Sequence, residues 1–165
     1  MTEEQNFLKV CLVDNLDIST KKGQAQLREI AKSQNVMESE LIALFNNFKS
    51  EIKRIKSLHQ AKKDKMCADW LRVPANFYQW YLEQPRKCSY CGVSEEQVRE
   101  YFKKNPSRGG RRGQNLEIER IVPKDPYSPE NCIMACYVCN NAKSDFMSNE
   151  DFKPIADGIK KFWKK

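Results

Sequence analysis

Four of the seven cysteines form two Cys-x-x-Cys pairs, Cys88 with Cys91 and Cys136 with Cys139. Each short loop turns two thiolates towards one point, and four thiolates about 2.3 Å from one ion make a tetrahedral zinc site. Four sulfur ligands leave zinc no open position for water or substrate, so we expect a structural role. The remaining cysteines have no such partner and are expected to be small buried residues: Cys11, Cys67 and Cys132.

Polar residues suited to phosphate chemistry lie between and just after these pairs. The run LEIERIV, residues 116–122, alternates as a half-buried strand does and puts Glu119 on the opposite side from Arg120. The second cysteine pair runs directly into a predicted helix, on which Asn140 and Lys143 share a face. A hairpin followed by this helix brings Glu119 towards Asn140, around a space where a phosphate fits.

Arginines supply the positive charge near this strand. Arg120 stays charged near neutral pH, so it can donate hydrogen bonds to a phosphate but cannot act as a general base. Three more arginines stand among glycines in a segment that is too polar for a core and is predicted to be a pliant loop: Arg108, Arg111 and Arg112. We expect this loop and Lys143 to contact nucleic-acid phosphates.

The elements that position these residues divide near residue 70, into a helical arm (1–70) and the module that holds the cysteine pairs (71–165). In the arm, a helix from Gly23 stops at Asn35. A longer helix follows, with apolar residues three and four apart: Leu41, Leu44, Phe45, Phe48, Ile52, Ile55 and Leu58. We interpret this stripe as packed on a core or on a partner; a dimeric coiled-coil arm or a helix lying on DNA are the alternatives. The stretch 28–45 faintly resembles a helix-turn-helix, but its turn lacks a diagnostic residue set and none is predicted.

Two more patterns describe the start of the cysteine module. Five aromatic residues crowd together at helical spacing and are expected to pack in a core rather than stack on bases: Trp70, Phe77, Tyr78, Trp80 and Tyr81. Ser94 and Gln97 form a capping box that predicts a helix start after Val93.

Composition favours a polyanionic partner. The 165 residues include 29 Lys and Arg against 22 Asp and Glu, a net charge of +7, and basic side chains neutralise phosphates. An odd number of cysteines without a secretion signal argues against disulfides. The sequence has no apolar run of the roughly 20 residues that a membrane span needs, so we expect a soluble, cytoplasmic protein that binds no membrane.

The motifs together resemble those of the HNH (ββα-metal) endonucleases. In that family a strand ends in Asp-His, and an Asn precedes a second Asn or His on the helix by nine residues; here the strand reads Glu119-Arg120, and Asn131 precedes Asn140 by nine. The similarity covers residues 77–165 and is greatest to a branch of restriction endonucleases in which Arg replaces the His. It implies an α+β fold: a zinc-stapled ββα-metal module with a mainly helical N-terminal arm.

The resemblance also implies roles for individual residues. Glu119 and Asn140 would hold a catalytic Mg²⁺ or Mn²⁺, and Asn131 would fix the hairpin. Arg120 would stabilise charge on the scissile phosphate, and Tyr127 would act as nucleophile or base. The implied activity is metal-dependent cleavage of DNA phosphodiester bonds by a restriction or defence nuclease. Cutting both strands with one site per chain would call for a homodimer.

Two departures from the family pattern keep alternatives open. Glu119 is one methylene longer than the family's Asp, and a shift of about 1 Å in a reacting group can cost about a hundredfold in rate. His59, the only histidine, is expected to be exposed on the long helix, with a general base supplied by the arm as the other interpretation. The competing hypotheses are a catalytically silent zinc-stapled module that binds DNA or a partner, and a nuclease subunit of a larger complex.

Overall fold

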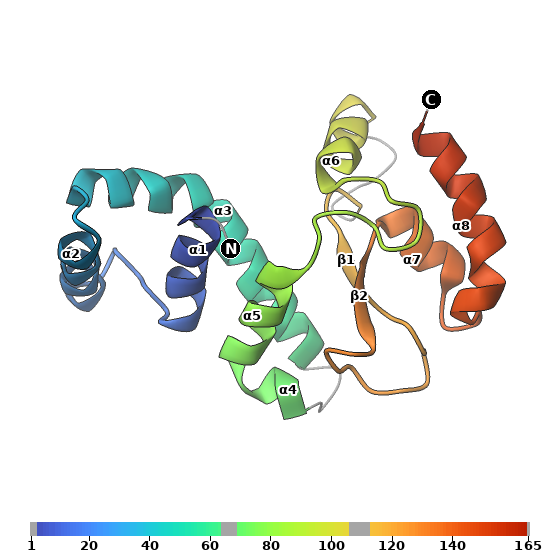
Figure 1. The fold of residues 1–165 in the computed structure, drawn as a ribbon, viewed down its shortest axis with the longest axis horizontal. Helices are drawn as coiled ribbons and strands as arrows, with labels where there is room; N and C mark the ends of the chain where they lie inside the picture. The colour runs from blue at the N-terminus through green and yellow to red at the C-terminus, as the bar shows by residue number, and fades with distance from the viewer. Residues whose placement is uncertain (1–2, 64–68, 106–112, 165) are drawn as a thin grey trace. The chain divides into compact units, whose positions relative to one another are not determined.

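The computed structural model describes residues 3–63, 69–105 and 113–164. Contacts divide the chain into two compact units, Met1–Glu83 and Gln84–Lys165, which Figure 1 shows with their elements labelled. We expected the division near residue 70. It falls later because the helix that ends at Glu83 packs on helices of the first unit.

The first unit is helical. Its elements are α1 (Glu3–Val13), α2 (Lys21–Gln34), α3 (Glu38–Lys63), α4 (Asp69–Arg72) and α5 (Pro74–Glu83). Helix α3 contacts all four other helices, and α1 also packs on α5. The side chain of Thr20 caps the start of α2, and Asn35 ends it in the left-handed conformation, as predicted.

The apolar stripe of α3 packs inside this unit. Its residues Leu41, Phe45, Ile52 and Ile55 are at most 8% exposed, so the interpretation as a core-packed helix is confirmed. The aromatic cluster is also core: Phe77 and Tyr81 are completely buried and stack with ring centroids 6.1 Å apart.

The prediction that His59 is exposed is wrong. Its side chain is 4% exposed, and its ring lies 5.0 Å from that of Phe77 and 5.4 Å from that of Tyr78. A single polar ring on the apolar side of a helix is covered when a second helix, here α5, packs over it.

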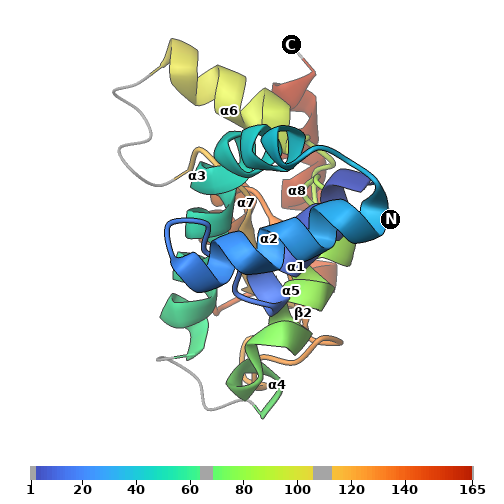
Figure 2. The same cartoon turned by 90° about the vertical axis from the view of Figure 1, so that its left-hand side faces the viewer.

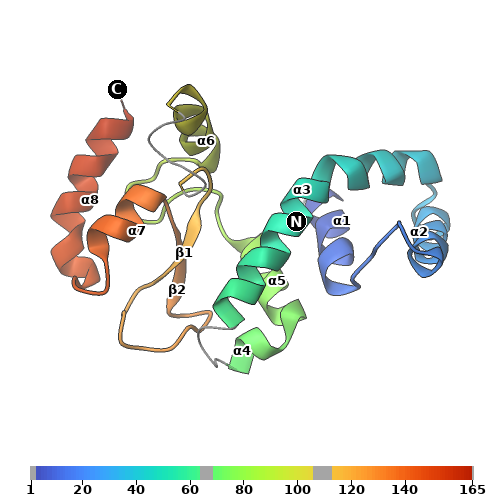
Figure 3. The same cartoon turned by 180° about the vertical axis from the view of Figure 1, so that it is seen from behind.

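The second unit is a two-stranded hairpin with three helices. Its elements are α6 (Glu95–Lys104), β1 (Glu117–Arg120), β2 (Cys132–Ala135), α7 (Tyr137–Lys143) and α8 (Asn149–Trp163). The strands are antiparallel, with Glu119 opposite Ile133 and Arg120 opposite Cys132. Helix α7 lies against β1, and α8 packs on α7, as Figure 3 shows from behind. The predicted α+β fold, helical in its N-terminal part, is confirmed.

Local signals place these elements. The Ser94 and Gln97 capping box is present and starts α6. Next to it, the buried carboxylate of Glu95 pairs with Arg86 at 2.6 Å and accepts a hydrogen bond from the backbone N–H of Leu116. This contact attaches the start of the hairpin to α6. None of the described helices is long and apolar enough to cross a membrane.

Candidate metal centre and active site

The four paired cysteines meet in one buried cluster. Their Sγ atoms all lie within 4.8 Å of one another, and those of Cys91 and Cys136 are 3.8 Å apart. A tetrahedral ion with four bonds of about 2.3 Å has sulfurs roughly 3.8 Å apart. The cluster therefore fits a zinc-sized ion, and the donor set of four thiols suits zinc.

Backbone turns point the sulfurs inward. Gly92 has φ +76°, a left-handed conformation that glycine adopts without strain, and its N–H donates to the carbonyl of Cys88. Cys136 caps α7, because its sulfur accepts a hydrogen bond from the backbone N–H of Cys139. The first pair thus belongs to a glycine turn and the second to a helix start.

Hydrogen bonds among the four thiols shift their pKa values. The pKa of Cys88 is lowered, chiefly because the thiols of Cys136, Cys139 and Cys91 donate hydrogen bonds to it. The pKa of Cys139 is raised, because its proton is held against the sulfurs of Cys136, Cys88 and Cys91. Binding of a metal ion replaces these protons with one cation that all four sulfurs share.

A polar face of β1 lies against α7. The Glu117 side chain accepts a hydrogen bond from Nδ2 of Asn140. Two residues along the same strand, Oε1 of Glu119 lies 3.5 Å from Nζ of Lys143. Side chains two apart on β1 thus face side chains three apart on α7, and two polar pairs form between the strand and the helix.

Lys143 does not lie at the surface. Its side chain is completely buried, and Nζ also donates to the backbone carbonyl of Arg120 at 3.2 Å. In this conformation it cannot meet a phosphate in solvent, which was the role expected from the sequence. It instead holds the last turn of α7 to the end of β1 and neutralises the buried carboxylate of Glu119.

Arg120 stands at the end of β1, where the loop of the hairpin begins. Its guanidinium donates to Oδ1 of Asp145 at 3.1 Å and to the carbonyl of Asp125 at 3.4 Å. It also lies over the ring of Tyr127, 5.1 Å from the ring centroid. The two residues to which the resemblance assigns catalytic roles are therefore in contact.

Asn131 closes the hairpin loop. Its Oδ1 accepts from the N–H of Val122 at 2.8 Å, and its Nδ2 donates to the carbonyls of Val122, Asp125 and Pro126. One side chain thus ties together the loop that runs from Arg120 to Tyr127.

Oxygen donors for a divalent cation are present on the facing surfaces of β1 and α7. Glu119 is 9% exposed, and Asn140 keeps Oδ1 after its Nδ2 is used. Carboxylate and amide oxygens are the ligands that Mg²⁺ and Mn²⁺ prefer, so the donor chemistry fits. The ammonium of Lys143 next to Glu119 opposes the binding of a cation there.

The remaining predicted residues lie elsewhere in the described part of the chain or outside it. Arg108, Arg111 and Arg112 lie outside the described residues, as does Cys67. Cys11 and Cys132 are buried, as expected. His59 is enclosed by aromatic rings in the first unit, which does not favour it as a general base.

Two residues of the site were missed. Glu117 binds Asn140, and Asp145 binds Arg120. The strand alternation already put Glu117 on the same side as Glu119, so its position was readable from the sequence. The position of Asp145 was not, because it follows a turn in which Ser144 has φ +56°.

Comparison with known proteins agrees with this geometry. The family model described as HNH endonuclease matches residues 88–146, a range that includes both cysteine pairs, the hairpin and α7. No curated protein sequence matches the chain. A solved structure of the rare-cutting HNH restriction endonuclease PacI is similar, with a TM-score of 0.52 and 30% sequence identity over 68% of this chain and 75% of that chain. That share is more than the second unit alone, so the similarity extends into the first unit.

Proposed function

Because the chain belongs to the HNH endonuclease family, we propose that it is a metal-dependent DNA endonuclease of the restriction or defence type. One observation carries the proposal: Arg120 contacts the ring of Tyr127 at the end of the strand that holds Glu119. The family has a histidine at this place. Here the guanidinium of Arg120 would stabilise negative charge, and the phenol of Tyr127 would act as base or nucleophile. DNA as substrate follows from the PacI comparison and from the net charge of +7.

The residues divide the work as follows. Glu119 and Asn140 hold Mg²⁺ or Mn²⁺, which when bound neutralises charge on the scissile phosphate. Arg120 donates hydrogen bonds to the phosphate oxygens, where negative charge grows during the reaction. Asn131 keeps the loop between Arg120 and Tyr127 in place. The cysteine cluster holds a structural zinc that fixes the start of α7, and with it Asn140.

Tyr127 has two candidate roles, and both require its phenolic proton to pass to solvent first. As a base, it takes a proton from the attacking water. As a nucleophile, its oxygen bonds to phosphorus while the bond to the leaving oxygen breaks, and water later releases the protein from the DNA. Only the second role leaves a covalent protein–DNA adduct.

The test is cleavage of plasmid and phage DNA by the full chain with Mg²⁺, with Mn²⁺ and with EDTA. We expect cutting with either metal ion and none with EDTA. Arg120→Ala and Tyr127→Phe should each lose about a hundredfold or more in rate. Tyr101→Phe is the matched control, because the Tyr101 ring packs on Phe162 and Trp163, where the C-terminal parts of α6 and α8 meet.

Denaturing gels of the reaction separate the two roles of Tyr127. A slow-migrating DNA band that protease removes, present in the wild type and absent in Tyr127→Phe, identifies the nucleophile. Cutting that survives Tyr127→Phe unchanged contradicts both roles.

A catalytically silent DNA-binding module is the second candidate. It is favoured by the ammonium of Lys143, which already pairs with Glu119 and competes with a cation there. DNA binding without cutting under any metal condition would select this candidate.

Cleavage of both strands also requires two active sites, and we propose a homodimer. The apolar stripe of α3 is not its interface, because that stripe is used within the first unit. Light scattering with and without a cut-site duplex gives the number of chains per complex.

We further propose that Arg108, Arg111 and Arg112 contact phosphates.

A further inference from the structure

The first unit contains a helix–turn–helix that the nuclease chemistry does not use. Helix α2 ends at Gln34 and α3 begins at Glu38, so three residues connect them. Asn35 makes the turn in the left-handed conformation (φ 53°), and the N–H of Val36 donates to the carbonyl of Ala31 at 3.0 Å. The two helices run crosswise in Figures 1 and 2. A short turn between crossed helices is the arrangement with which many proteins present a helix to DNA.

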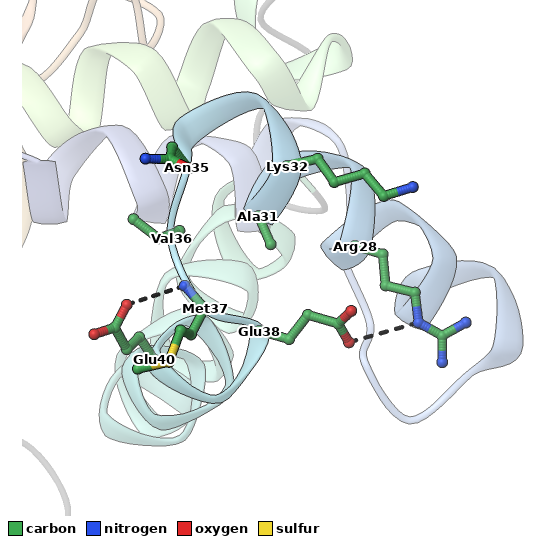
Figure 4. A pocket seen from close by; sticks show the side chains of 8 residues that line it. All are labelled: Arg28, Ala31, Lys32, Asn35, Val36, Met37, Glu38 and Glu40. Atoms are coloured by element: carbon green, nitrogen blue, oxygen red, sulfur yellow. Dashed lines mark hydrogen bonds and ion pairs between the residues drawn. The ribbon is translucent and has the colours of Figure 1, made fainter.

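Buried residues hold the two helices together. Leu27 and Ala31 of α2 and Leu41 and Phe45 of α3 are at most 8% exposed, and the helices are in contact. Ala31 is the smallest of these residues, which permits a close approach just before the turn. The hollow at the turn has a volume of about 420 Å³ and is lined by both helices, as Figure 4 shows.

Polar contacts stiffen the turn. Oε2 of Glu40 accepts a hydrogen bond from the backbone N–H of Met37 at 3.1 Å, and Arg28 reaches across to Glu38 at 3.5 Å; Figure 4 shows both contacts. The first of these satisfies a donor at the start of α3. The hydrogen bond from Met37 therefore fixes the first turn of α3, while the exposed Arg28–Glu38 pair adds little to its stability.

After an acidic first turn with Glu38 and Glu40, the outward face of α3 carries neutral residues of the kinds that read base pairs. Ten residues at the turn and in the first ten positions of α3 are exposed, two of them acidic: Asn35, Val36, Met37, Glu38, Ser39, Glu40, Ile42, Ala43, Asn46 and Asn47. Asparagine pairs with two atoms of adenine, serine bonds to several bases, and small apolar groups contact the methyl of thymine. Four of these positions in succession, 42, 43, 46 and 47, carry no charge, although 31% of all residues do.

Helix α2 carries exposed basic residues, of which Arg28 pairs with Glu38 and Lys32 with Glu29. Lys21, Lys22, Arg28 and Lys32 are exposed. In a helix-turn-helix the first helix crosses the phosphate backbone while the second enters the major groove. The lysines thus belong to α2, the helix that would contact phosphates, and the neutral residues belong to α3, the helix that would contact bases.

We propose that α2, the turn and α3 bind duplex DNA in a sequence-dependent way, with the first half of α3 in the major groove. This assignment goes beyond the nuclease site, because it concerns the unit that holds none of the metal or catalytic residues. It gives the first unit the task of choosing where the DNA is bound.

The experiment uses the full chain in EDTA, so that binding is measured without cutting. A sequence is first selected from a random duplex library, and its affinity is then measured by fluorescence anisotropy. The double variant Asn46→Ala/Asn47→Ala should lose about tenfold or more in affinity for the selected sequence and little for random DNA. Asn6→Ala, at an exposed position of α1, is the matched control and should change neither.

Lysine variants test the other half of the proposal. Lys21→Ala/Lys22→Ala should weaken binding to all sequences alike and reduce the salt dependence of the binding constant by about one or two ions. Circular dichroism of each variant verifies the fold, since all four side chains are exposed.

The outcomes separate this proposal from the nuclease proposal. If Asn46→Ala/Asn47→Ala binds the selected sequence as the wild type does, or if the wild type binds no duplex, the helix-turn-helix assignment is wrong, whether or not DNA is cut. If the double variant loses sequence preference while no metal supports cutting, the assignment holds and the nuclease proposal fails.

Discussion

Asn140 of α7 donates a hydrogen bond from its Nδ2 to the carboxylate of Glu117 on β1. A carboxylate can only accept hydrogen bonds, so it must face the amino end of the amide. Oδ1 of Asn140 is then the end that remains for a cation. Glu117 thereby decides which atom of Asn140 the site presents, although the family resemblance gave Glu117 no role.

Glu117→Gln should therefore weaken the use of the metal ion more than the binding of DNA. Glutamine can face Asn140 with either end, so the orientation of the amide is no longer dictated. We expect about tenfold lower activity and a higher Mg²⁺ concentration for half-maximal rate, in line with other residues that orient ligands. Cleavage rates measured against Mg²⁺ and against DNA separate the two effects. An unchanged Mg²⁺ requirement would contradict the positioning role.

Removal of the metal from the cysteine cluster should unfold the second unit. Structural zinc contributes directly to folding free energy, because the unfolded chain has no preformed site. Cys139→Ser should bind no zinc and lose the cooperative unfolding transition of this unit, as followed by circular dichroism. Wild-type protein should release one zinc per chain to a colorimetric chelator. Cys132→Ala is the control, since Cys132 is buried in β2 outside the cluster.

Asn131→Ala should open the loop between Arg120 and Tyr127. Four side-chain hydrogen bonds are lost, at about 1 kcal/mol or less each because the site is partly exposed. We expect a loss of about 2 kcal/mol in unfolding free energy and a larger proportional loss of activity. Asn141→Ala, which removes one exposed bond to Tyr137, serves as control in urea titrations. Equal effects of the two variants would contradict the loop-closing role.

Lys143→Met should leave the carboxylate of Glu119 buried without its cation. Breaking one partner of a buried pair commonly costs about 3 kcal/mol or more, and the contact to the Arg120 carbonyl is lost as well. If Glu119 binds the catalytic ion, added Mg²⁺ should raise the melting temperature of Lys143→Met more than that of the wild type. Thermal unfolding with and without Mg²⁺ measures this, with the exposed Lys160→Met as control. Equal shifts would speak against Glu119 as a ligand.

Cys11 should make the stability of the chain depend on alkaline pH. Burial raises the pKa of its thiol from 9.0 to about 12, so the folded state keeps a proton that the unfolded chain gives up. The contribution of the protonated Cys11 thiol to the free energy of unfolding is fully present below pH 9. It is lost as the pH rises towards 12, by up to about 1.4 kcal/mol per pH unit. Urea titrations between pH 8 and 11 should show the difference between wild type and Cys11→Ala shrinking. A constant difference would contradict the role of this thiol.

Local features of the molecule were readable from the sequence. The cysteine pairs, the helix stop at Asn35, the capping box at Ser94 and the hairpin followed by a helix all depend on residues a few positions apart. Such signals depend on backbone conformation and short-range hydrogen bonds, which the neighbouring residues determine. The alternation in β1 even placed Glu117 and Glu119 on one face.

Packing between distant elements decided the rest. The polar side chains of His59 and Lys143 were expected to be exposed to solvent. Instead, rings of α5 cover His59, and the backbone carbonyl of Arg120 at the end of β1 accepts a hydrogen bond from Lys143. The division of the chain after Glu83 and the pairing of Arg120 with Asp145 likewise depend on which surfaces meet. The sequence alone therefore determined which chemical groups this protein has and the local elements that hold them. Tertiary structure alone decided which groups are in contact, because burial and ion pairing depend on neighbours far away in the chain.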